Sequence, residues 1–169
     1  QNKRNEAAQV LAAAVMEKDN AGRLRSLTKV AEDYSGTGAA LWSRIELGNQ
    51  ASRDKKYPEA LAFYTEVYED LPGDSPLRPL LEYALAQNNE NAGKLDQAQL
   101  YYRKLADNKS FRVIALSAQG RILESKGDKV GALKVYQEAA EDQELSGQSR
   151  SILAEKINTL QTASPAKGS

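Results

Sequence analysis

The sequence contains no cysteine and no histidine among its 169 residues. Without cysteine the chain has no disulfide, no thiol nucleophile and no cysteine-type zinc site. Without histidine it lacks the commonest protein metal ligand and the side chain most often used in acid–base catalysis. An enzyme could still use Asp, Glu, Lys, Ser or Tyr, but the composition favours a non-catalytic protein without metal or cofactor.

The sequence also has no excess of charge and no long hydrophobic run. Its 23 Lys and Arg residues balance 23 Asp and Glu residues. Because nucleic-acid-binding proteins usually carry a basic excess and anionic lipid attracts basic segments, we expect neither as a partner. The longest nearly uncharged stretch, Ala7–Met16, is about ten residues long, half of the roughly 20 needed to span a bilayer. Any membrane anchor or signal segment would therefore lie upstream of Gln1.

Proline and aromatic residues are few, with 5 Pro and 7% aromatic residues. No segment shows the strict apolar–polar alternation of a half-buried strand. Apolar residues instead recur three or four positions apart, as they do on one face of a helix. Leu61, Tyr64, Val67, Tyr68 and Leu71 are one such series. The chain is therefore predicted to be all-α, with about nine helices.

Two polar sequence patterns could suggest a functional site, but each is explained more simply by the helical structure. Ser35-Gly36-Thr37-Gly38 lacks the Lys-Ser/Thr pair and the preceding strand of a phosphate-binding loop, so we expect a turn between helices. The many carboxylates, such as Glu66 and Glu138, are interspersed with Lys and Arg. We therefore expect solvated helix faces rather than a convergent acid–base pair.

A pattern of small residues and tyrosines repeats along the chain. Three pairs place alanine four residues before tyrosine: Ala60–Tyr64, Ala98–Tyr102 and Ala132–Tyr136. The preceding helix of each unit carries another small residue: Gly48, Ala86 and Gly120. We expect the small residues to let the two helices of a unit approach closely and the tyrosines to fill the groove toward the next unit. Such units bury their apolar surface only when stacked.

The turns agree with this repeat. Pro58 stands where the first turn of a helix is expected, a position that tolerates proline. Gly93 and Gly127 each follow a helical stretch, where a left-handed residue commonly ends a helix. Ala98 and Ala132 are 34 residues apart (132 − 98), whereas Ala60 and Ala98 are 38 apart (98 − 60). The longer connection at 71–76 explains the difference.

The pattern resembles the tetratricopeptide repeat family, whose unit is a helix–turn–helix of about 34 residues. The departures are Arg44 and Glu82, which stand where the first two units should carry Trp or Leu, and the absence of a terminal proline from the last two. The resemblance implies a right-handed α–α superhelix of helix pairs. It predicts one domain over residues 1–162, with a degenerate helix pair (1–38), repeats at 39–74, 75–110 and 111–144, and a capping helix at 145–162. Residues 163–169 are expected to form a disordered tail.

The resemblance also implies a binding surface. In this family the concave groove is lined by the first helix of each pair at fixed positions. Carried over, these positions are Trp42, Ile45, Asn49, Arg53, Leu80, Tyr83, Gln87, Asn91, Ile114, Ser117 and Arg121, with Ser52, Glu90, Glu124 and Ser125 completing the set. Aromatic and Arg side chains make good anchors for a partner protein or peptide. In the alternative interpretation, Trp42 and Tyr83 pack against the N-terminal helix pair and the groove is filled.

A closer resemblance concerns the layout of the chain. The segment Gly36–Leu41, the Tyr-Pro-Glu-Ala-Leu motif at Tyr57–Leu61 and the C-terminal helix resemble the YfgM-type ancillary subunits of the bacterial Sec translocon. This resemblance implies a periplasmic domain behind an N-terminal inner-membrane anchor, which the basic Lys3-Arg4 pair would fit. It also implies a scaffold or adaptor whose partners are chaperones or emerging chains. The alternatives are a structural subunit of an outer-membrane biogenesis or secretion assembly, and a cytoplasmic regulatory repeat domain.

Overall fold

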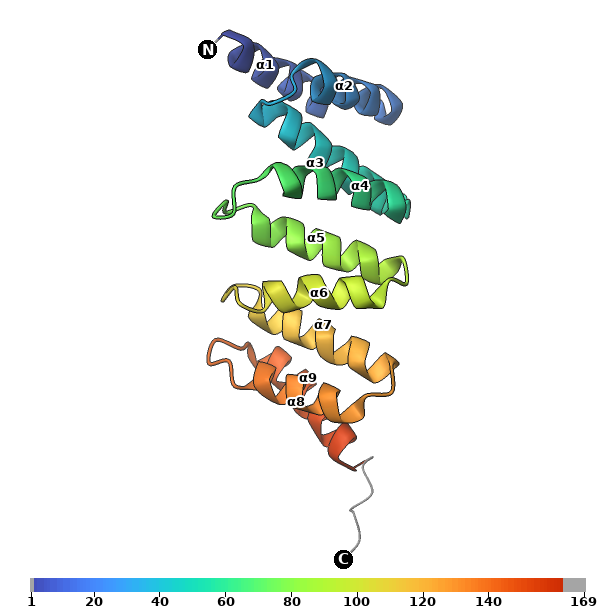
Figure 1. Ribbon diagram of the computed structural model, residues 1–169, viewed down its shortest axis with the longest axis vertical. Coiled ribbons are helices and arrows are strands. Elements are labelled where there is room, and N and C mark those ends of the chain that lie inside the picture. Colours follow the sequence, from blue (N-terminus) through green and yellow to red (C-terminus); the bar gives the residue numbers. More distant parts are fainter. Residues whose placement is uncertain (1, 163–169) are drawn as a thin grey trace, which may run out of the picture. The chain divides into compact units, whose positions relative to one another are not determined.

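A computed structural model describes residues 2–162, and within this range the chain forms nine α-helices (Figure 1). They are α1 (Asn2–Met16), α2 (Asn20–Asp33), α3 (Gly38–Arg53), α4 (Tyr57–Asp70), α5 (Arg78–Asn91), α6 (Leu95–Leu105), α7 (Arg112–Ser125), α8 (Lys129–Ala140) and α9 (Gly147–Thr162). The all-α prediction is confirmed. The tail expected at 163–169 lies outside the described residues.

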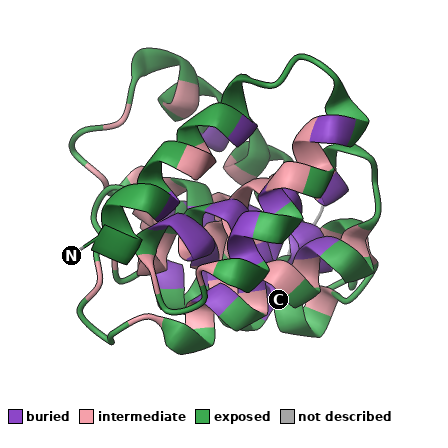
Figure 2. Ribbon diagram, turned by 90° about the horizontal axis from the view of Figure 1, so that it is seen from above, coloured by how far each residue is buried: buried purple, intermediate pink, exposed green. Residues whose placement is uncertain are grey.

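The chain divides into two compact units, Gln1–Ala92 and Gly93–Ser169. The N-terminal unit contains α1 to α5, and the C-terminal unit contains α6 to α9. Within each unit, helices that follow one another in the sequence pack side by side. Figure 2 shows buried residues on the helix faces that turn toward their neighbours and exposed residues on the outer turns and loops.

The core of the N-terminal unit begins where α1 packs on α2 and α3. One cluster joins Ala7, Val30 and Ala39, and a second joins Ala14, Leu27 and Leu47. Each cluster takes one residue from each of the three helices, because apolar residues at helical spacing form a single stripe on each helix. The side chain of Asp19 caps α2 by accepting a hydrogen bond from the backbone N–H of Gly22 at 2.7 Å.

The turns inside the helix pairs share one backbone geometry. Gly93 and Gly127 have φ angles of 74° and 80°, which confirms the left-handed turn expected at both glycines. Lys55 takes the same conformation with φ 59°, although it is not a glycine. Pro58 lies in the first turn of α4, as predicted.

In two of the helix pairs, a glycine of the first helix packs directly against a tyrosine of the second helix. A Cβ atom on Gly48 would lie 2.8 Å from Cε1 of Tyr64, and one on Gly120 would lie 2.4 Å from Cε1 of Tyr136. Both tyrosines are buried. The prediction that these small residues allow close approach is therefore confirmed, and the group that fills the space is the tyrosine ring itself.

The core of the C-terminal unit runs from α6 to α9. Its buried apolar side chains are Ala98, Tyr102, Leu105, Ala106, Ala115, Leu116, Ala118, Ile122, Ala132, Tyr136, Ala139, Leu153 and Leu160. Between α6 and α7, the buried Gln119 donates a hydrogen bond from Nε2 to the carbonyl oxygen of Tyr102 at 3.3 Å. This bond satisfies a polar group that would otherwise destabilise the core.

Candidate functional site

In the N-terminal unit, residues of α3, α4 and α5 line a pocket of about 220 Å³, which we name the α3–α5 pocket. Its lining consists of Trp42, Ile45, Asn49, Tyr64, Leu77, Leu80, Leu81 and Ala84. Four of the predicted groove residues are thus brought together. Trp42 is 45% exposed and Leu80 is 54% exposed, so two large apolar side chains of this pocket reach solvent.

The other predicted residues of this unit lie outside the lining of the α3–α5 pocket. Gln87 donates a hydrogen bond to the hydroxyl of Tyr83, one turn away on α5, at 2.7 Å. Arg53 and Asn91 are exposed and are the last residues of α3 and α5. Trp42 also lines a neighbouring pocket with residues of α1, so it lies beside the N-terminal helix as well as in the predicted groove.

In the C-terminal unit, residues of α7, α8 and α9 line a larger pocket of about 350 Å³, which we name the α7–α9 pocket. Its lining consists of Val113, Ile114, Ser117, Arg121, Tyr136, Ser149, Ile152, Leu153 and Lys156. It contains three of the groove residues predicted here, Ile114, Ser117 and Arg121, whereas the predicted Glu124 and Ser125 are not in its lining. Ile114 is 49% exposed and Ile152 is 54% exposed.

A shift of 72 residues (114 − 42) relates the two pockets. The equivalent pairs are Trp42 and Ile114, Ile45 and Ser117, Asn49 and Arg121, Tyr64 and Tyr136, Leu77 and Ser149, Leu80 and Ile152, Leu81 and Leu153, and Ala84 and Lys156. Each pocket therefore consists of the first helix of a pair, the tyrosine of the second, and the helix that follows. Helix α9, expected only as a cap, holds in the C-terminal unit the place that α5 holds in the N-terminal unit.

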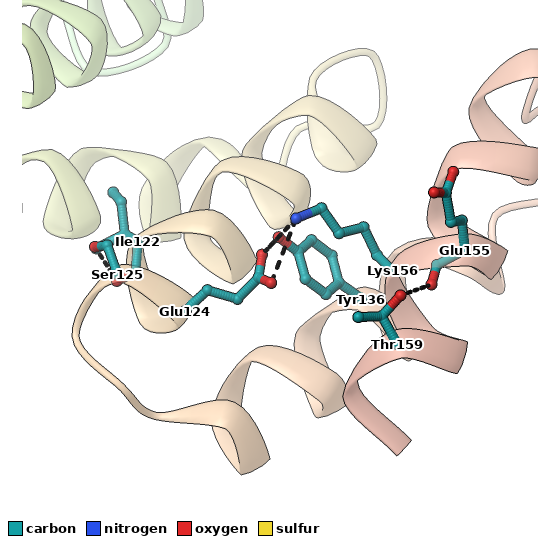
Figure 3. Close-up of polar contacts among 7 residues, drawn as sticks. All are labelled: Ile122, Glu124, Ser125, Tyr136, Glu155, Lys156 and Thr159. Atoms are coloured by element: carbon teal, nitrogen blue, oxygen red, sulfur yellow. Dashed lines mark hydrogen bonds and ion pairs between the residues drawn. The ribbon is translucent and has the colours of Figure 1, made fainter. Parts of the chain in front are cut away.

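A polar cluster lies beside the α7–α9 pocket (Figure 3). The hydroxyl of Tyr136 donates a hydrogen bond to Oε2 of Glu124 at 2.6 Å, and Nζ of Lys156 donates to the same atom at 3.0 Å. Burial, then the hydrogen bond to Glu124 and its charge, raise the pKa of Tyr136 well above its ordinary value. The charge of Arg121 acts in the opposite direction and lowers this pKa.

The carboxylate of Glu124 is ionised in this cluster. Partial burial acts to raise its pKa, but the hydrogen bonds from Tyr136 and Lys156 and the charge of Lys156 outweigh burial and lower the pKa. The tyrosine of the α3–α5 pocket has a neutral partner instead, since Tyr64 donates to Oδ1 of Asn49 at 2.7 Å. Burial raises the pKa of Tyr64 to about 12. The two pockets thus share equivalent lining positions but differ in the partner of the tyrosine, which is an amide in one and a carboxylate in the other.

Both pockets have the composition of a binding site. Each pocket combines apolar walls with a few polar groups, the usual composition of a ligand or partner site. Among residues 2–162 no three acidic side chains are grouped as a metal site would require. No helix in that range is long and apolar enough to cross a membrane.

Comparison with known proteins identifies the family. No curated protein matches the sequence. The family described as tetratricopeptide repeat-like domain matches residues 1–162. Domains of this kind generally mediate protein–protein interaction. The match covers the same nine helices and both pockets, so the chain belongs to the tetratricopeptide repeat-like domain family.

Proposed function

We propose that this chain is a non-catalytic adaptor that binds a partner protein or peptide through the α3–α5 and α7–α9 pockets. The observation that carries the proposal is the repetition of one pocket design in both units. In each, two large apolar side chains are about half exposed: Trp42 and Leu80 in one, Ile114 and Ile152 in the other. Exposed apolar groups that gather in a hollow are typical of interaction sites.

The setting that we propose is the bacterial cell envelope. The domain would lie in the periplasm, behind an N-terminal inner-membrane anchor, at the Sec translocon. This part of the proposal is supported by the resemblance of Gly36–Leu41 and Tyr57–Leu61 to YfgM-type subunits. Its partners would then be periplasmic chaperones or chains that emerge from the translocon.

A specific observation favours a second function, that of a structural subunit in an outer-membrane or secretion assembly. Val130 of α8 is 76% exposed and Leu100 of α6 is 47% exposed. Both belong to second helices of pairs, and neither lines the α3–α5 or the α7–α9 pocket. A partner that covers these residues would leave the pockets unused.

Photo-crosslinking of the full-length protein in its own cells separates the two functions. A photoreactive side chain is placed at Leu80, at Ile152 and, for comparison, at Val130, and the adducts are identified by mass spectrometry. We expect a common protein partner from Leu80 and Ile152, and a translocon component or periplasmic chaperone would support the envelope setting. Adducts from Val130 without adducts from either pocket would reject the adaptor function.

A further inference from the structure

Residues of α1 and α3 line a further pocket of about 360 Å³, which we name the α1–α3 pocket. On α1, Arg4, Ala8 and Leu11 are four and three residues apart, so they share one face of the helix. The first turn of α3 and the side chain of Trp42 complete the lining. The face of α1 that borders this pocket thus carries a cation at its N-terminal end and apolar side chains beyond it.

Trp42 joins the α1–α3 pocket to the α3–α5 pocket, because it lines both and is about half exposed. Both pockets belong to the N-terminal unit, so their linings form one surface across α1, α3 and α5, which we name the Trp42 surface. Its other large apolar side chains include Leu11, Ile45 and Leu80. Helix α1 therefore continues the binding surface proposed above, although none of the groove residues predicted from the sequence lies on it.

The Trp42 surface carries one charged side chain, that of Arg4, and no carboxylate lines either pocket. Arg4 is exposed, and among residues 2–162 its side chain forms no hydrogen bond or ion pair. Glu6, two residues further along α1, lies outside the pocket lining and accepts a hydrogen bond from the hydroxyl of Tyr34 at 3.0 Å. The guanidinium group of Arg4 is therefore available to an anionic group of a partner.

An apolar surface with one unpaired cation is complementary to a ligand that combines an apolar group with an anion. Arginine binds carboxylates especially well, because its planar group can donate two parallel hydrogen bonds. The surface spans three helices, and domains of this family generally mediate protein–protein interaction. These observations favour a protein segment over a small anion.

We propose that the Trp42 surface binds a segment of a partner protein in which an Asp or Glu side chain lies near a large apolar side chain. The carboxylate would pair with Arg4, and the apolar side chain would cover Trp42. This inference rests on the proposed adaptor function, adds α1 to its binding surface and specifies the chemistry of the partner.

The test begins with selection from a library of short random peptides displayed on phage, with the whole chain as bait and no free peptide C-terminus. Enriched peptides that lack tryptophan are then added to the protein, in which Trp42 is the single tryptophan. A shift of its emission to shorter wavelength identifies the peptides that cover Trp42. We expect these peptides to carry Asp or Glu within about four positions of a large apolar residue, the spacing over which side chains share one face. No enrichment, no emission shift, or a shift without an acidic residue would overturn the proposal.

One such peptide is synthesised with an amidated C-terminus, and its affinity is measured from the emission of Trp42. Arg4→Gln should weaken binding about twofold to fivefold, because one exposed ion pair is lost. Replacing the peptide carboxylate by an amide should weaken binding to the parent protein by a similar factor and leave binding to Arg4→Gln unchanged. Equal weakening of binding to both proteins would contradict the pairing of the carboxylate with Arg4.

Lys3→Gln is the matched control, because Lys3 is the neighbouring exposed cation on α1 and does not line the α1–α3 pocket. In this variant the change from carboxylate to amide should weaken binding as much as in the parent, and circular dichroism should show that both variants keep their helical content. An emission shift with rising concentration of the chain alone would mean that a second copy covers Trp42, which would overturn the proposal. Peptides that cover Trp42 without an acidic residue would reject the inference and leave the adaptor function standing, whereas absent crosslinks from Leu80 and Ile152 would reject that function.

Discussion

Single residues decide how closely the helices of a pair approach. Gly48 and Gly120 have no side chain where the rings of Tyr64 and Tyr136 lie, and both tyrosines are buried. Each ring fills the volume that a Cβ would need, so the glycine and the tyrosine form one packing unit. The dense core cannot absorb an extra methyl group without moving the ring or the backbone.

Gly120→Ala tests this contact. Its new Cβ would lie 2.4 Å from the Tyr136 ring. Alanine favours a helix by about 1 kcal/mol, but overpacking costs about 1–3 kcal/mol, so we expect a net loss of stability. Urea unfolding followed by circular dichroism measures the change. The control is Gly147→Ala, because a Cβ at Gly147 would meet no atom within 4 Å. Equal stability of the two variants would contradict the packing argument.

Lys55 is a second position at which the conformation of the backbone affects the stability of the protein. Its φ of 59° lies in the left-handed region, where the equivalent turns carry Gly93 and Gly127. In this region a residue with a side chain is less stable than glycine by about 1–2 kcal/mol. Glycine regains only part of this energy, because its unfolded chain has more conformational freedom to lose on folding. Lys55→Gly should therefore raise the free energy of unfolding by up to about 1 kcal/mol, measured by urea denaturation. Lys55→Ala keeps a Cβ and should show no such gain. A gain of the same size would mean that the lysine side chain, and not the backbone, is the cause.

Among the elements, α9 has the most informative role. Buried Leu153 and Leu160 hold it against the rest of the C-terminal unit, and Lys156 joins it to Glu124 of α7. The ion pair spans 32 positions in the sequence. Because α9 supplies Ile152 and Lys156 to the α7–α9 pocket, its docking affects both the stability of the unit and the proposed binding surface.

The contribution of Glu124 depends on pH with a defined sign. Its pKa in the folded chain is below the ordinary value of 4.5, so the stabilisation is present above that value and is lost as pH falls through the folded pKa. Glu124→Gln should therefore lower stability by about 1 kcal/mol or less at neutral pH, and this loss should become smaller as the pH falls below 4.5. Thermal unfolding of both proteins across this range measures the difference. Glu155→Gln, which replaces an exposed carboxylate next to Lys156 on α9, is the matched control variant. A loss that stays constant as the pH falls would mean that the charge of Glu124 is not its cause.

Across the whole molecule, stability is expected to be uneven. Helix α1 buries only Ala7 and Ala14, whereas α3 buries six residues. In repeat proteins each unit is stabilised by its neighbours, so a helix with little buried surface opens at low free energy. Hydrogen exchange measured by mass spectrometry should therefore show fast exchange of α1 amides and slow exchange of α3 amides. Similar protection of the two helices would contradict this expectation.

Much of the architecture could be predicted from the order of residues, because its causes are local. Apolar spacing specifies helices, Pro58 suits the first turn of α4, and Gly127 closes the turn after α7. The alternation of small residues and tyrosines identifies helix pairs and agrees with the family match. The repeat boundaries and the superhelical arrangement stay predictions.

Only the tertiary structure decided which of the predicted groove residues share a pocket. The shift of 72 residues, the role of α9 as the equivalent of α5, and the cluster of Tyr136, Glu124 and Lys156 all join distant parts of the sequence. The left-handed Lys55 carries no local signal that marks it. Sequence periodicity reports which face of a helix is apolar, but the packing of several helices determines which side chains meet and where charge gathers.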